Sequence, residues 1–211
     1  WWVQDAAAAM PMRLMGEIRG RKVLDLCAAP GGKTAMLCAL GAEVTAVERD
    51  PKRMTRLSEN LARLKLCATL VQADARDVAP GDAYDAVLLD APGTGTGTIR
   101  RHPDLAWIKE PDDVRALSML QLELLEGAFA RLAQGGRLIY CVCSLQPEEC
   151  EQVIASFLAR ECAAKLMPIL PDELPGCAQF KTANGDLRTT PAHWPELGGL
   201  DGFFAARLTR H

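Results

Sequence analysis

The chain has 211 residues, of which 49% are hydrophobic and 24% are charged, and its formal net charge is −3. This composition is typical of a folded globular domain, and the length allows a sizeable core. The negative net charge excludes a generally basic surface, so any contact with nucleic acid must be local. The sequence shows no signal peptide and no apolar run of membrane length, so we expect no membrane partner.

Eight cysteines are scattered along the chain, and no two of them form a C-x-x-C pair. This spacing disfavours a structural zinc site, and a disulfide framework is uncommon in a chain of this length. We therefore expect a protein without a bound metal, located in the reducing cytoplasm.

Apolar runs alternate with helical patterns in the first half of the chain. Asp5, and later Asp50 followed by Pro51, are typical of helix N-termini. The predicted helices span residues 6–15, 33–40 and 51–64, and the predicted strands span residues 23–26, 43–48, 68–73 and 84–90.

The second half begins with a glycine-rich stretch over residues 91–109 that has no helical period, and long loops of this kind are commonly functional. The elements predicted after it are a helix over 114–132 stopped by a glycine pair, a strand over 137–143, a helix that carries residues 153–158, and an edge or hairpin strand over 202–208. Alternating strands and helices predict an α/β fold with a doubly wound, mostly parallel sheet and an antiparallel edge.

The first predicted strand runs into a loop of small residues, Cys27 to Gly32, and then into a helix. Such a unit holds adenosine-bearing cofactors, because small side chains let the ligand approach and the helix start offers free N–H groups. A phosphate-binding loop is the weaker alternative, suggested by Gly32-Lys33-Thr34. Position 27 lacks the glycine that this motif requires, and Pro30 removes a donor amide.

Acidic residues follow three of the predicted strands, and parallel strands bring them to the same edge of the sheet. Glu48 is suited to ribose hydroxyls, while Asp74 suits either an adenine amino group or the local turn. Asp90 ends the fourth strand and Cys143 ends the fifth. Cys143 is a candidate nucleophile, with a nearby helix start expected to favour its thiolate, although a structural role is the alternative.

Several motifs resemble those of the RNA cytosine-C5 methyltransferases, and most closely the Sun family, the small-subunit rRNA methyltransferase B proteins. Asp90 to Gly97, followed by Ile99 to Asp104, resembles motif IV of these enzymes. The other matching stretches, which together cover nearly the whole chain, are Trp2–Asp5, Asp25–Thr34, Tyr140–Ser144, Pro147–Glu149 and Asp201–Phe204.

This resemblance implies a Rossmann-like enzyme that transfers a methyl group from S-adenosylmethionine to C5 of a cytosine in RNA, expected to be 16S rRNA, through a covalent cysteine adduct. Cys143 matches the catalytic nucleophile, and Asp90 is expected to orient the base. The residues that match the cofactor-binding positions are Cys27, Ala28, Ala29, Pro30, Gly31, Gly32, Lys33, Glu48, Asp74 and Asp90, with Glu48 in place of the usual Asp.

The resemblance also implies that residues 1–211 form a single catalytic domain from the C-terminal part of a longer protein, which would carry an RNA-binding region before it. Within this chain, Arg100, Arg101 and His102 are expected to contact the RNA backbone, with a solvated surface as the alternative.

One departure from the family pattern bears on catalysis. The family has a second cysteine directly after Ala-Pro in motif IV, where it is thought to help resolve the adduct, and this chain has Gly93. We therefore keep an alternative, an RNA-binding protein that retains the cofactor pocket but has impaired turnover. A small-molecule methyltransferase is disfavoured by the presence of Cys143 together with the Arg-Arg-His-Pro stretch that begins at Arg100.

Overall fold

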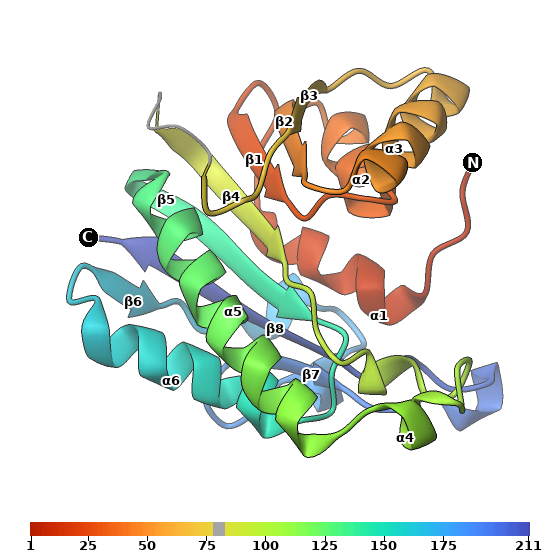
Figure 1. The fold of residues 1–211 in the computed structure, drawn as a ribbon. Coiled ribbons are helices and arrows are strands. Elements are labelled where there is room, and N and C mark those ends of the chain that lie inside the picture. The colour runs from red at the N-terminus through yellow and green to blue at the C-terminus, as the bar shows by residue number, and fades with distance from the viewer. Residues whose placement is uncertain (78–82) are drawn as a thin grey trace.

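The computed structural model describes residues 1–77 and 83–211. In this part of the chain one sheet has the strand order β3-β2-β1-β4-β5-β8-β6, with β7 also paired to β8 (Figure 1). Strands β1 to β5 run parallel, and β8 is antiparallel to β5, β6 and β7. The strands are β1 Lys22–Leu26, β2 Glu43–Glu48, β3 Thr69–Gln72, β4 Tyr84–Asp90, β5 Leu132–Val142, β6 Ala164–Leu166, β7 Leu187–Thr189 and β8 Phe203–Arg210.

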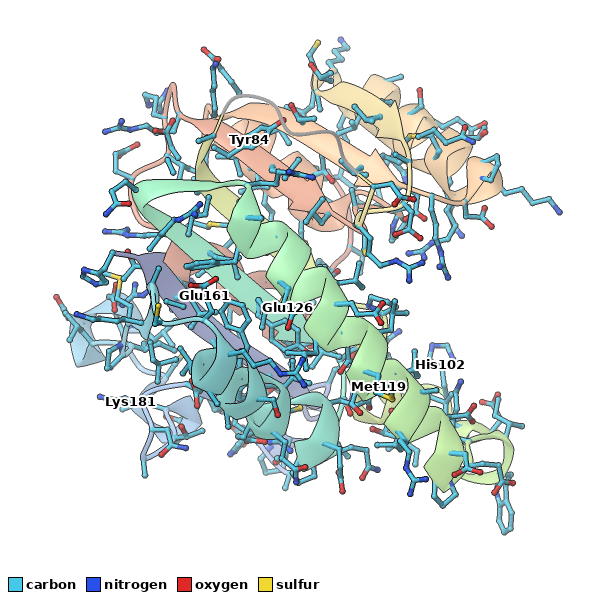
Figure 2. All side chains as sticks on the ribbon, turned by 60° about the vertical axis from the view of Figure 1, so that its left-hand side comes forward. Tyr84, His102, Met119, Glu126, Glu161 and Lys181 are labelled. Atoms are coloured by element: carbon cyan, nitrogen blue, oxygen red, sulfur yellow. The ribbon has the colours of Figure 1, made fainter. Side chains whose placement is uncertain are left out.

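Helices cover both faces of this sheet, and α5 and α6 lie side by side on one of them (Figure 2). The α-helices are α1 Ala6–Ala9, α2 Gly32–Ala39, α3 Pro51–Leu64, α4 Leu105–Ile108, α5 Pro111–Ala130 and α6 Glu151–Arg160. Short 3-10 helices are η1 Met10–Met15, η2 Thr96–Thr98, η3 Pro147–Glu149, η4 Pro171–Glu173, η5 Ala178–Phe180 and η6 Pro195–Leu197.

Side chains that alternate along the central strands build two separate cores. In β4, Ala86 and Leu88 belong to the core under α1, α2 and α3, whereas Val87 and Leu89 belong to the core under α5 and α6. Strands buried on both faces need apolar residues at successive positions, which is why the predicted strands read as continuous apolar runs. Cys141 lies in the first of these cores and Cys143 packs against it, so both point to the same face.

The predicted α/β class, the mostly parallel sheet and the antiparallel strands are confirmed. Local signals placed the helix starts correctly: Asp50 caps α3 by accepting a hydrogen bond from the Arg53 amide at 2.9 Å, and Asp5 accepts from the Ala7 amide at 2.9 Å. The predicted N-terminal helix divides into α1 and η1, because the chain tightens to 3-10 geometry from Met10 onwards.

Some details of the predicted elements differ from the structure. The predicted edge or hairpin strand near the C-terminus is β8, which belongs to the antiparallel edge of the sheet but is not its outermost strand, because it lies between β5 on one side and β6 and β7 on the other. Helix α5 ends at Ala130 rather than at the glycine pair, and β5 already begins at Leu132. Gly135 and Gly136 lie where the register between β4 and β5 shifts, and Gly135 has a φ of +71°. The long loop also contains η2 and α4.

Candidate active site

The predicted acidic residues and Cys143 meet at the carboxyl ends of the parallel strands. They line one cavity of about 200 Å³. Its lining includes Cys27 after β1, Glu48 at the end of β2, Asp74 after β3, Asp90 at the end of β4, and Cys143 after β5. This convergence follows from strand direction, because parallel strands place all their carboxyl ends at one edge. The roles predicted for these side chains remain predictions.

The glycine loop contributes to this cavity mainly through Cys27. Burial, followed by the negative charge of Asp90, raises the pKa of Cys27 to about 12, so its thiol is neutral at physiological pH. Pro30, Gly31 and Gly32 instead line a separate hollow of about 350 Å³ beside the first residues of the chain. The sequence could not show this, because the opposing wall comes from residues distant from the loop.

Tight contacts fix the backbone of the loop. Gly31 has a φ of +100°, and a Cβ atom there would lie 2.5 Å from Cδ1 of Leu57 in α3. Only glycine meets both requirements without strain. Ala28 and Ala29 are buried, the Ala28 amide donates to the carbonyl of Val47, and the Arg53 guanidinium donates to the carbonyl of Ala29. The loop is therefore held between β2 and α3.

Lys33 and Thr34 are not arranged as in a phosphate-binding loop. The Nζ of Lys33 donates to Oδ2 of Asp90 at 2.8 Å and lies 4.9 Å from the ring centroid of Phe203. Thr34 donates to the fully buried carboxyl of Asp25 at 2.6 Å. The Lys33 ammonium and the Thr34 hydroxyl therefore both donate to carboxyl groups of this chain. Burial is the largest single influence and lowers the pKa of Lys33, but the charge of Asp90, the hydrogen bond to it and the nearby Cys141 and Cys143 together hold that pKa above its ordinary value.

Glu48 ties β2 to the glycine loop and to α3. Only 2% of the residue is exposed. One carboxylate oxygen accepts from the Ala29 amide at 3.3 Å, the other accepts from the Asp50 amide at 3.0 Å, and Arg53 lies 3.6 Å away. Its carboxylate is therefore held in a defined orientation at the wall of the cavity.

Asp74 makes the turn contacts that were one of the two roles left open by the sequence, and the adenine contact remains a prediction. Its carboxylate accepts hydrogen bonds from the backbone and side chain of Arg76 at 2.9–3.0 Å, which is the turn-forming arrangement. These hydrogen bonds lower the pKa of Asp74 to about 2. Asp74 also lines the cavity, so it presents a permanent negative charge there.

Cys143 is partly buried, directly follows the carboxyl end of β5, and lines the cavity together with Asp90. Burial, and after it the charge of Asp90, raises the pKa of this thiol to about 11, while the charge of Lys33 acts in the opposite direction. The expectation that a helix start favours the thiolate was wrong. Helix α6 begins only at Glu151, after a loop and η3, so its N-terminus does not follow Cys143 directly.

The two arginines of the predicted RNA-binding loop form ion pairs within the chain. Arg101 binds Asp201 in a bidentate arrangement whose shortest contact is 2.6 Å, and Arg100 lies 3.0 Å from Asp5 and 3.3 Å from Asp201. These pairs fasten the loop to the N-terminal and C-terminal segments. His102 is exposed and lies at the end of the molecule where α5 begins (Figure 2). Contact of these residues with RNA remains a prediction.

Sequence reasoning gave no individual role to Glu149, although it belongs to one of the matching motifs. Its side chain is fully buried and accepts hydrogen bonds from Thr94, Gln121 and Ser144. The available signal was its position in the matching Pro147–Glu149 stretch, where the structure buries Glu149 although Pro147 and Glu148 are exposed. Burial of an ionisable side chain requires partners, and these come from segments far away in the sequence.

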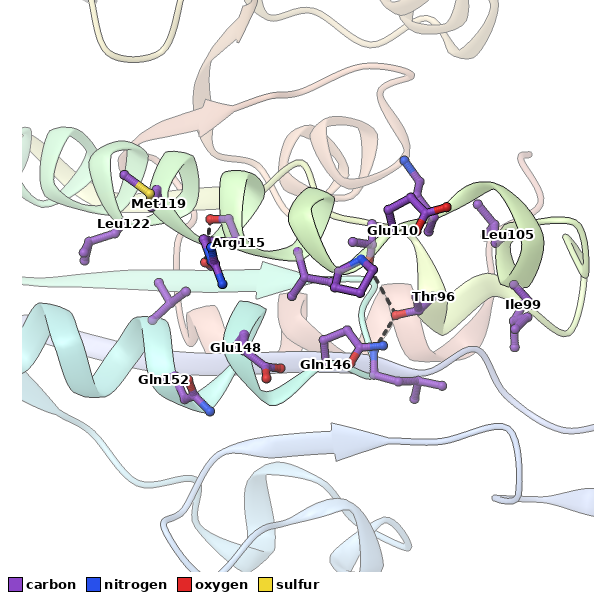
Figure 3. Close-up of a pocket in the computed structure, with 18 of the residues that line it drawn as sticks. Thr96, Ile99, Leu105, Glu110, Arg115, Met119, Leu122, Gln146, Glu148 and Gln152 are labelled. Carbon is purple, nitrogen blue, oxygen red and sulfur yellow. Dashed lines mark hydrogen bonds between the residues drawn. The ribbon is translucent and has the colours of Figure 1, made fainter.

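A larger groove of about 760 Å³ lies on the other side of the loop that follows β4 (Figure 3). The loop, α4, α5 and the start of α6 enclose it, and Thr96 reaches from the loop towards Gln146. The hydroxyl of Thr96 accepts from the Leu145 amide at 3.0 Å, which joins this loop to the segment after Cys143.

Neither a metal centre nor a membrane span is found in the described residues. No group of three or more His, Cys, Asp or Glu side chains there is arranged to hold a metal ion. None of the helices in residues 1–77 and 83–211 is both long and apolar enough to cross a membrane.

The sheet order and the cavity at the carboxyl ends of its strands define a Rossmann-like methyltransferase fold. The crystal structure of PH0851 superposes with a TM-score of 0.88 and 36% identity, covering 99% of this chain and 47% of that chain. NSun6 from Pyrococcus horikoshii, solved with SFG, gives a TM-score of 0.84 and 28% identity over 99% of this chain and 53% of that chain. Residues 14–209 match the 16S rRNA methyltransferase RsmB/F family, and the chain belongs to this family.

Curated relatives carry the name ribosomal RNA small subunit methyltransferase B. The protein from Photorhabdus laumondii is 41% identical over 213 residues, and that from Vibrio vulnificus is 43% identical over 215 residues. Each alignment covers 99% of this chain but 46% of the relative. The chain therefore spans about half the length of these relatives.

Proposed function

We propose that this chain is a methyltransferase domain that uses S-adenosylmethionine to methylate C5 of a cytosine in RNA. The observation that carries this proposal is the shared cavity, in which Asp90 and Cys143 lie together with Glu48 and Asp74. Family membership and the names of the curated relatives support small-subunit rRNA as the substrate.

The cavity lining suits S-adenosylmethionine on chemical grounds. Glu48 and Asp74 offer carboxylate oxygens to ribose hydroxyls and to an amino group, and Val47, Leu120 and Leu124 offer apolar surface to an adenine ring. When bound, the cofactor supplies an electrophilic methyl group. A ring of carboxylates also favours the positive charge of a sulfonium.

The chain supplies the groups that make C5 of cytosine reactive. The Cys143 thiolate adds to C6, which raises the electron density at C5. Asp90, held by Lys33 at 2.8 Å through one oxygen, is placed to donate a hydrogen bond from its other oxygen to N3 when it carries a proton, and in that form it stabilises the negative charge that develops on the ring as the thiolate adds. After methylation a base or water takes the C5 proton, and the electron pair of that C–H bond expels Cys143 as a thiolate, which restores both the aromatic ring and the free enzyme. The target base must be unstacked to reach these groups.

Transfer of a labelled methyl group to 16S rRNA tests the proposal. Cys143→Ala should reduce the rate by at least about 100-fold, because the covalent step is lost. Cys162→Ala is the matched control, since Cys162 is also a free cysteine and is exposed at the surface. Equal activity of the wild type and Cys143→Ala would contradict the nucleophile, and absence of both cofactor binding and transfer would contradict the enzyme class.

The alternative function is an RNA-binding protein with a cofactor pocket and impaired turnover. Gly93 favours it, because the residue that the family resemblance associates with adduct resolution is missing. A protein–RNA band that resists denaturant and accumulates with time would support slow release. Prompt multiple turnover without such a band would contradict it.

A further inference from the structure

Strands β4 and β5, which lead to Asp90 and Cys143, stop pairing with each other at the active site. The last paired positions of β4 and β5 are Asp90 and Cys141, and the Ala91 amide donates to the Cys141 carbonyl at 2.8 Å. Beyond this point the ladder no longer sets the spacing between the two segments. A backbone hydrogen bond from Gly97 to Cys143, at 3.2 Å, joins them again further along the loop.

The carboxylate of Glu149 bridges this gap. One oxygen accepts from the Thr94 amide at 2.8 Å and from Nε2 of Gln121 at 3.0 Å. The other accepts from the hydroxyls of Thr94 and Ser144, each at 2.5 Å. Thr94 follows Gly93 in the loop after β4, and Ser144 directly follows Cys143. A single side chain thus holds the residues next to both catalytic segments.

The surroundings of Glu149 make it a rigid connection. Its residue is fully buried, and the donors to its carboxylate are all neutral groups. Gln121, which reaches it from α5, also donates to the Pro92 carbonyl at 2.9 Å, and Tyr140 donates to the Glu149 backbone carbonyl at 2.6 Å. Hydrogen bonds to a buried carboxylate are strong and directional, so each donor is held in place.

We propose that Glu149 is a positioning residue that sets the separation between Asp90 and Cys143. This inference rests on the proposed function. In that function a cytosine base must fit between the Cys143 thiolate and the Asp90 carboxyl group, so the distance between these two groups affects the rate. Its effect should therefore appear in the reactivity of Cys143 and in kcat. Cofactor affinity should change little, since Glu149 does not line the cavity that Glu48 and Asp74 share.

Three variants test this role: Glu149→Ala, Glu149→Gln and the control Glu148→Ala, in which a neighbouring exposed acid is removed. We expect Glu149→Ala to lower kcat at least about tenfold, because misplaced reacting groups and unpaired buried donors are costly. The KM for S-adenosylmethionine should change less than about threefold. Glu149→Gln keeps one acceptor and the shape of the side chain, so it should recover kcat to within about threefold of the wild type.

Alkylation of Cys143 by iodoacetamide, followed by mass spectrometry of the modified peptide, provides a second measurement that needs no RNA. In Glu149→Ala the rate at Cys143 should change at least about threefold, whereas the rate at the exposed Cys162 should not change. If the wild type proves inactive, the proposed function fails, but a changed alkylation rate still supports positioning. An unchanged alkylation rate at Cys143 in Glu149→Ala overturns the positioning role of Glu149.

Ser144→Ala keeps the test decisive if Glu149→Ala does not fold. This change removes one of the donors to Glu149, and we expect about a threefold decrease in kcat without a change in cofactor KM. Unchanged kcat in every soluble variant overturns the proposal. So does a decrease in cofactor affinity as large as the decrease in kcat, because that pattern indicates general loss of structure.

Discussion

A cysteine introduced at position 93 should destabilise the protein. A Cβ atom added to Gly93 would lie 2.7 Å from Cγ2 of Val142 and 3.1 Å from Oε1 of Glu149. Val142 cannot easily move away, because it is a β-branched residue, fully buried in the core under α5 and α6. The space that a side chain at position 93 would need is already filled.

The loss of stability follows from the overlap between a side chain at position 93 and Val142. Overpacking of a well-packed interior costs about 1–3 kcal/mol, so we expect the free energy of unfolding of Gly93→Cys to fall by that amount. At about 2–4 °C per kcal/mol for a domain of this length, the Tm should fall by roughly 2–12 °C. Removing the obstructing methyl group should relieve the strain, so the double variant Gly93→Cys/Val142→Ala should be more stable than the two single effects predict, by about 1 kcal/mol or more.

Urea denaturation of the wild type, both single variants and the double variant measures this coupling. Gly127→Ala is the matched control: it also adds a Cβ atom, but its nearest neighbour is the Ala75 carbonyl oxygen at 3.8 Å, and alanine favours the helix. We expect the control to be neutral or stabilising. A Gly93→Cys variant as stable as the wild type, or strictly additive effects with Val142→Ala, would refute the reasoning.

Three further predictions follow from the contacts of the site. Burial and the charge of Asp90 raise the pKa of Cys143 to about 11, so only the thiolate fraction reacts and alkylation should accelerate about tenfold per pH unit from about pH 7 to pH 10. Lys33→Met leaves the Asp90 carboxylate without its 2.8 Å partner, and we expect the free energy of unfolding to fall by about 2 kcal/mol in urea denaturation. Asp201→Asn weakens the bidentate contact with Arg101, so trypsin should cleave after that arginine faster than in the wild type.

Each of these predictions has a result that would contradict it. A pH-independent alkylation rate would show that the thiolate already predominates at neutral pH. For Lys33→Met the control is Lys165→Met, which alters an exposed lysine, and equal stability of the two variants would argue against the buried contact. An unchanged trypsin pattern in Asp201→Asn would mean that the loop is held by other contacts, such as the hydrogen bond from Gly97 to Cys143.

The sequence by itself determined the fold class and the edge of the sheet at which the site lies. Strand patterns, helix patterns and the helix-capping residue Asp50 each involve only residues that are close together in the sequence. They can therefore be recognised without knowing how the rest of the chain folds. The placement of Glu48, Asp90 and Cys143 in one cavity followed from strand direction alone, because parallel strands share their carboxyl edge.

Only the tertiary structure decided what these side chains contact. The position of β8 inside the sheet depends on pairing with β5, β6 and β7, which lie at very different distances along the chain. The pairing of Lys33 with Asp90, and the raised pKa of Cys143, likewise depend on burial between segments that are distant in sequence. Hydrogen bonding and desolvation are set by the neighbours in space, and a pattern of residue types along the chain does not specify those neighbours.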